Sequence, residues 1–173
     1  MRFAVYGGFE IYRKERNGWG VFDKAFWARV EQQEQGLSRA CGCYVFALKN
    51  GENIKAWYVG KTEKSSFQKE CFQATKLMYY NETLNDHNGM PHLFLIARLT
   101  PTTGKFSKSG VNGYKDIDYL ESMLIGMALE KNGMLQNVKK TKFLRELVVP
   151  GVINTPAGRS TEAVLDLKNA LGL

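Results

Sequence analysis

Two tyrosines in the stretch 42–62 have the type and spacing of groups that could act together on a phosphodiester. Tyr44 lies near the start of one short apolar run and Tyr58 near the end of the next, with an Asn-Gly turn signal at 50–51 between them. A two-residue turn would put the phenols on opposite faces of the hairpin, whereas a three-residue connection or an equivalent bulge would put them on one face. The alternative to a catalytic pair is two tyrosines half-buried in a sheet, which is common.

Glu121 is the candidate metal ligand. It lies in a strongly apolar helical segment, 117–131, among the apolar residues that share one side of the helix. A carboxylate on a buried side carries a desolvation penalty unless a cation meets it. Mg²⁺ is often held by one or two carboxylates together with substrate phosphates. The alternative is a partly exposed glutamate at the edge of the apolar stripe, or one paired with a basic neighbour.

The elements that must position these residues alternate between strands and helices. Strand patterns cover 43–49, 54–59 and 93–99, and helical patterns begin at Ser65 or Ser66, at 117 and at 161. Residues 1–40 carry a short strand pattern and a helical pattern, and we expect them to pack on the core as an elaboration. The segments predict the α+β class, with helices packed on a short sheet.

Composition narrows the classes of protein that remain. The chain has 173 residues, 44% of them hydrophobic, which favours one compact folded domain rather than a disordered chain. No membrane-spanning run or signal-peptide pattern is present, so we expect a cytoplasmic protein without a membrane partner, and three free cysteine thiols. The formal net charge of +7 fits a polyanionic partner such as a nucleic acid, although it fits solubility equally well.

Two tripeptides at the ends of the hairpin resemble a known family. Gly42-Cys43-Tyr44 and Tyr58-Val59-Gly60 are similar to the two halves of the GIY-YIG nuclease signature, with cysteine where isoleucine is usual. The later order of helix, apolar strand, helix with Glu121, and Asn137 also follows the family. The resemblance covers about residues 41–140, with an extension at 141–173 that ends in a helix.

The resemblance implies a small three-stranded antiparallel sheet flanked by helices, and a hydrolase that cuts DNA with one Mg²⁺ or Mn²⁺ ion. By that resemblance Tyr44 would help to deprotonate the attacking water, and Tyr58 would position the water or the phosphate. Glu121 would hold the metal, and Asn137 would bind phosphate or brace the site. Because the ordinary pKa of a phenol is about 10, Lys61 is the candidate cation beside the phenols.

One position departs from the family. Active members usually carry an arginine on the first helix, where this chain has Glu70. Lys69, Lys76, Lys61 and Arg98 are the candidate substitutes, although lysine lacks the bidentate fork of arginine. Lys69, Lys76, Arg98 and Gly60 are the candidate substrate contacts. Three functions therefore stay open: a metal-dependent endonuclease, a nucleic-acid-binding module of the same fold that has lost cleavage, and a protein-interaction domain.

Overall fold

The computed structural model describes residues 1–16, 19–22, 25–153 and 161–172. The chain divides into two units, 1–137 and 138–173. Residues 1–40 belong to the same unit as the expected core, and the division falls close to the expected boundary at 140. Within the described residues, no helix is long and apolar enough to cross a membrane.

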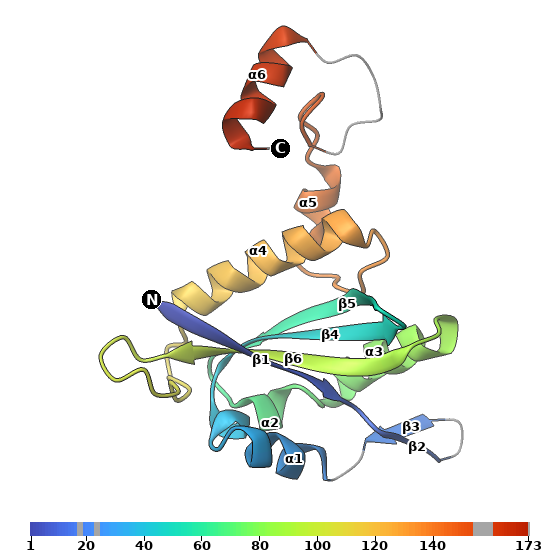
Figure 1. Cartoon of the computed structure of the whole chain (residues 1–173), viewed down its shortest axis with the longest axis vertical. Coiled ribbons are helices and arrows are strands. Elements are labelled where there is room, and N and C mark those ends of the chain that lie inside the picture. The colour runs from blue at the N-terminus through green and yellow to red at the C-terminus, as the bar shows by residue number, and fades with distance from the viewer. Residues whose placement is uncertain (17–18, 23–24, 154–160, 173) are drawn as a thin grey trace. The chain divides into compact units, whose positions relative to one another are not determined.

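A four-stranded antiparallel sheet forms the centre of the first unit (Figure 1). Its spatial order is β1-β6-β4-β5, and its strands are β1 (Arg2–Glu10), β4 (Gly42–Asn50), β5 (Asn53–Thr62) and β6 (Met90–Leu99). A separate two-stranded sheet joins β2 (Arg13–Arg16) to β3 (Trp19–Phe22). The α+β class is confirmed, whereas the expected three strands are one too few. The missing strand is β1, whose pairing with β6 shifts register between Tyr6 and Phe9, where two glycines interrupt the strand pattern.

Helices cover both faces of this sheet (Figure 1). One face carries α1 (Phe26–Gln33), the short helix η1 (Leu37–Arg39), α2 (Phe67–Glu70) and α3 (Ala74–Asp86). The opposite face carries α4 (Lys115–Lys131), which runs along β5 and β4. The expected apolar helix at 117–131 is confirmed and begins two residues earlier.

Alternation along the strands divides the core between the two faces. Leu93, Leu95 and Ala97 of β6 are fully buried and pack with the helices of the α1–α3 face, whereas Ile96 packs with Ile117 of α4. Each fully buried aliphatic side chain of this kind stabilises the fold by about 1.5–3 kcal/mol relative to an exposed one. The three cysteines are free, as the sequence predicts, and all three are buried.

The hairpin between β4 and β5 contains a bulge. Its turn residues are Gly51 and Glu52, because Asn50 pairs with Asn53. Pairing continues to Ala47 with Ala56 and then shifts, so that Phe46 pairs with Tyr58 and Trp57 is the extra residue. The turn has two residues, but it lies at 51–52 instead of the expected 50–51, so neither of the two expected registers occurs. The bulge shifts the pairing of β4 and β5 by one residue, so Tyr58 lies on the face of the hairpin that carries Phe46 and Tyr44.

The helix expected from Ser65 or Ser66 is interrupted. It forms as α2, and Gln73 then adopts an extended conformation (φ −64°, ψ 153°) before α3 begins. The break changes which residues of α3 face the sheet. Met78 is 40% exposed, while Tyr80 is fully buried.

The second unit contains two helices, α5 (Thr141–Glu146) and α6 (Glu162–Leu171). An isolated bridge between Val149 and Ile153 follows α5. The position of α6 confirms the final helix expected from about residue 161.

Candidate functional site

The phenol side chains of Tyr44 and Tyr58 lie next to each other on the α1–α3 face of the hairpin. Their ring centroids are 6.3 Å apart and the rings are tilted by 35°. The glycines of both tripeptides are sterically required. A Cβ on Gly60 would overlap the Tyr44 ring, and a Cβ on Gly42 would overlap the carbonyl oxygen of Ile96. The two tripeptides therefore describe a real spatial arrangement, in which one glycine makes room for the tyrosine of the other strand.

Two tyrosines of α3, which sequence reasoning missed, complete this group of phenols. Tyr79 stacks on Tyr58 with ring centroids 5.5 Å apart, and Tyr80 stacks on Phe46 at 4.1 Å. Offset and stacked aromatic pairs contribute about 0.5–1.5 kcal/mol beyond their buried area. The consecutive tyrosines at 79 and 80 were the available signal, but the unbroken helix expected there assigned the buried positions to other residues.

Burial keeps both phenols of the hairpin protonated at neutral pH. Tyr44 is 0% exposed, and burial raises its pKa far above the usual value for tyrosine. Burial, followed by the negative charge of Glu121, raises the pKa of Tyr58 to about 12. A protonated phenol can donate a hydrogen bond, but it cannot accept a proton from water. The arrangement therefore fits hydrogen-bond donation and does not fit the proton-accepting role that the resemblance implies for Tyr44.

The Tyr44 hydroxyl is unusual in its surroundings. It is fully buried and has no hydrogen-bond partner of good geometry in the described part of the chain. It is near enough to Tyr58 to lower that pKa, but this influence is weaker than burial and than the charge of Glu121. The contact with Tyr58 is too poorly aligned to satisfy the Tyr44 hydroxyl, which is uncommon for a buried polar group.

Glu121 lies half-buried on α4, and its charge acts on Tyr58. It does not belong to a cluster of ligands, since the described residues contain no group of three or more His, Cys, Asp or Glu side chains placed to hold a metal ion. The donor set therefore fits only a hard cation such as Mg²⁺ that takes one carboxylate from the protein and further oxygens from water and substrate phosphate. It does not fit a tightly held resident metal.

Asn137 braces β5 beside Tyr58. The Val59 amide donates to its Oδ1 (2.9 Å), and its Nδ2 donates to the Val59 carbonyl (2.7 Å). The Gln136 amide donates to the carbonyl of the bulged Trp57 (2.8 Å), and Asn132 Nδ2 donates to the Ala56 carbonyl (2.8 Å). Of the two roles expected for Asn137, bracing is the one that these contacts describe.

Two of the expected cations lie on the opposite face of the sheet. Lys61 pairs with Asp118 (2.6 Å) and with Glu63 (3.1 Å). Arg98 pairs with Asp116 (2.8 Å) and lies over a tyrosine ring of the loop before α4. Side chains alternate along a strand, so Lys61 points away from the face of Tyr58 and Gly60. The structure does not bring Lys61 or Arg98 to the phenols, which corrects their expected placement.

Glu70 is not a substitute for the arginine of the family. It pairs with Lys76 across 2.8 Å, with Gln73 hydrogen-bonded to both. Its negative charge contributes to the raised pKa of Tyr44 and of Tyr58. Lys76 carries the positive charge that a substitute for the arginine needs, but it already pairs with the Glu70 carboxylate. Lys69 is exposed.

Comparisons of this chain with protein-family models, with curated proteins and with solved structures find no match.

Proposed function

We propose that the chain is a GIY-YIG-type domain that hydrolyses DNA phosphodiester bonds with one Mg²⁺ or Mn²⁺ ion. The observation that carries the proposal is the hairpin bulge, which puts the phenols of both tripeptides on one face. Glu121 lies on α4, on the other face of the sheet, and its charge still raises the pKa of Tyr58 in the outer strand β5. The spatial order β5-β4-β6, the helices on both faces and the brace from Asn137 support the same proposal. The positive net charge supports DNA as the partner.

Within this proposal Tyr58 and Glu121 are the residues that meet substrate. Tyr58 is only partly buried and stays protonated, so it donates a hydrogen bond to a phosphate oxygen. Glu121 supplies the carboxylate oxygens that hold the cation. A bound cation would stabilise negative charge on the phosphate and on the leaving oxygen. Tyr44 is a positioning residue, because its buried ring fills the space over Gly60 and sets the place of Tyr58.

The test is cleavage of supercoiled plasmid in Mg²⁺ and in Mn²⁺. Glu121→Gln is expected to lower the rate by about 100-fold or more, because it removes the charge that holds the cation. Tyr58→Phe is expected to lower it by about 10- to 100-fold, the effect of one hydrogen bond to a charged group. Glu130→Gln, an exposed glutamate on the same helix, and Tyr119→Phe, an exposed phenol, are the matched controls and should cleave like the wild type.

A wild type without metal-dependent cleavage would contradict the proposed hydrolysis. Equal rates for all variants would contradict it as well, since the activity would then come from a contaminant.

The catalytically impaired, nucleic-acid-binding module is the second candidate, and one observation favours it. Glu70 carries a negative charge where the family has an arginine, and that charge raises the pKa of both phenols instead of neutralising a phosphate. Salt-dependent binding of duplex or single-stranded DNA without cleavage would support this module. The absence of any salt-dependent binding would exclude both candidates and leave a protein-interaction domain.

A further inference from the structure

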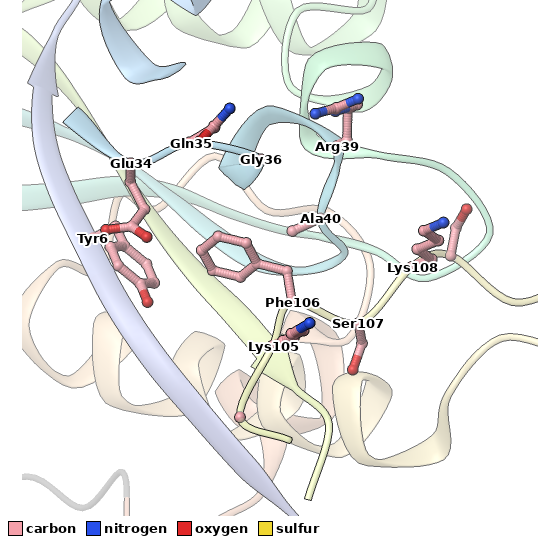
Figure 2. A pocket seen from close by; sticks show the side chains of 12 residues that line it. Tyr6, Glu34, Gln35, Gly36, Arg39, Ala40, Lys105, Phe106, Ser107 and Lys108 are labelled. Atoms are coloured by element: carbon pink, nitrogen blue, oxygen red, sulfur yellow. The ribbon is translucent and has the colours of Figure 1, made fainter. Parts of the chain in front are cut away.

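A hollow of about 770 Å³ opens on the first unit, away from the phenols (Figure 2). Its walls come from β1, from the segment that joins α1 to β4, and from the loop after β6. The charged and aromatic side chains that line it are those of Tyr6, Glu34, Arg39, Lys105, Phe106 and Lys108. Pockets for small ligands commonly measure about 300–1,000 Å³, so the hollow has the size of a binding site for one small molecule or one nucleotide unit.

The two ends of the hollow differ in charge. Figure 2 shows Tyr6 and Glu34 at one end, Arg39 and Lys108 at the other, and the ring of Phe106 between them with Lys105 beside it. Arg39 and Lys108 are exposed, so an anion can reach both, although the charge of Arg39 also helps to lower the pKa of Glu31. At the acidic end, Glu34 lies near Tyr6. Burial, followed by the charge of Glu34, raises the pKa of Tyr6.

The central ring is held in place from one side. Phe106 contacts Tyr6 edge to face, with ring centroids 5.5 Å apart. Its residue forms a bridge with Leu99 at the end of β6, and the next amide, that of Ser107, donates to the Arg98 carbonyl (2.8 Å). An aromatic ring fixed in this way and still partly exposed is a platform on which a planar group can stack.

The turn that carries Arg39 is fixed as well. The Glu31 carboxylate accepts hydrogen bonds from the amides of Gly36 (2.8 Å) and Ser38 (2.9 Å). These contacts, with burial opposing them, lower the pKa of Glu31, so its charge and the turn persist at neutral pH. Both walls are therefore formed before a ligand arrives, which lowers the entropic cost of binding.

We propose that this hollow binds a nucleotide. Its phosphate pairs with Arg39 and Lys108, its base stacks on Phe106, and an edge of the base that bears an amino group donates to Glu34. A simple polyanion would not fit as well, because the carboxylate of Glu34 repels it at the second end. Guanine fits the acidic end best, since its ring N–H and amino group lie side by side and match the two oxygens of a carboxylate. The site is independent of cleavage at Tyr58 and Glu121.

The nucleotide has two sources, a free mononucleotide or a unit of a single strand. Calorimetric titration with GMP, UMP and inorganic phosphate addresses the first source. Anisotropy of a fluorescein-labelled, guanine-containing single-stranded octanucleotide addresses the second. Both are run in EDTA, so that a failure of metal-dependent cleavage cannot be mistaken for a failure of this site.

Substitutions at each end of the hollow test the contributions of the two ends separately. Arg39→Gln and Lys108→Gln should each weaken binding by about five- to tenfold, as expected for one charged contact at a partly open site. For the single strand, each should also lower the dependence of log Kd on log salt by about 0.7. Glu34→Gln should reduce the preference for GMP over UMP. Lys49→Gln makes the same change of charge at an exposed position near the hairpin turn and should bind like the wild type.

Binding of GMP, or of the octanucleotide alone, that weakens in both cation variants supports the proposal and identifies the source. Wild-type binding of GMP and of the octanucleotide no tighter than that of inorganic phosphate would overturn it. Equal affinity of the wild type, Arg39→Gln and Lys108→Gln would overturn it too. Circular dichroism on each variant confirms that the exposed substitutions leave the fold intact.

Discussion

Replacing Tyr44 with phenylalanine is expected to stabilise the first unit, although it truncates a side chain that is 0% exposed. The reason is the hydroxyl, which is buried without a hydrogen-bond partner of good geometry in the part of the chain that the structure describes. A buried polar group in this condition costs about 1–3 kcal/mol. Removing one oxygen also leaves a small void and loses some contacts, so we expect a net gain of about 1 kcal/mol in the free energy of unfolding.

Urea denaturation followed by tryptophan fluorescence, to which the buried Trp57 of the same unit contributes, measures this change. Tyr114→Phe is the matched control. Its hydroxyl donates to the Lys108 carbonyl (2.9 Å), so the same substitution there should destabilise by about 0.5–1.5 kcal/mol. A loss of more than about 1 kcal/mol in Tyr44→Phe would show that the hydroxyl has a partner, and would refute the reasoning.

The same variant also tests the division of roles between the phenols. Because Tyr44 is a positioning residue, plasmid cleavage by Tyr44→Phe should stay within about threefold of the wild-type rate, an effect below 1 kcal/mol. Loss of cleavage with unchanged stability would instead mean that this hydroxyl meets substrate.

Three further predictions concern the architecture around the phenols. Gly60→Ala should destabilise by about 1–3 kcal/mol, because the new methyl group overlaps the Tyr44 ring, whereas Gly126→Ala, in open space on α4, should stabilise by up to about 1 kcal/mol; urea denaturation of both, side by side, checks the contrast. Asn137→Ala should cost about 2–4 kcal/mol, since it leaves the amide and carbonyl of Val59 without these partners, and faster amide exchange at Val59 should accompany the loss. All three thiols should stay unreactive toward a disulfide reagent at pH 8 until urea unfolds the protein, because they are buried; labelling of the folded protein would contradict this.

Much of the fold could be predicted from local patterns. The buried strand at 93–99 and the apolar helix at 117–131 each agree with the observed element, because one short segment contains the whole signal. The Asn-Gly signal at 50–51 marks the hairpin correctly, although its turn lies one residue later, at 51–52. The strand β1 could not be found in this way, since two adjacent glycines interrupt its pattern and its pairing with β6 is a long-range contact. The break at Gln73 was missed for a similar reason, because the apolar spacing on either side of it reads as continuous.

The candidate site could be predicted from local patterns only in part. The two tripeptides predict that Tyr44 and Tyr58 belong together, and this holds only because of the bulge at Trp57. The bulge depends on a contact far along the chain, the Gln136 amide that satisfies the Trp57 carbonyl, so no local pattern encodes it. The placement of Lys61 was wrong because position along a strand gives the face of a side chain only once the register is known.

Main-chain and side-chain amide groups of the segment 132–137 cover the outer edge of the strand β5. They occupy the outer hydrogen-bonding edge of β5 at Ala56, Trp57 and Val59, as an additional strand would. An unprotected edge is a template on which a strand from another molecule can add. Sequence changes in this segment, such as Asn137→Ala, are therefore expected to promote self-association through the uncovered edge of β5, in addition to their cost in folding energy.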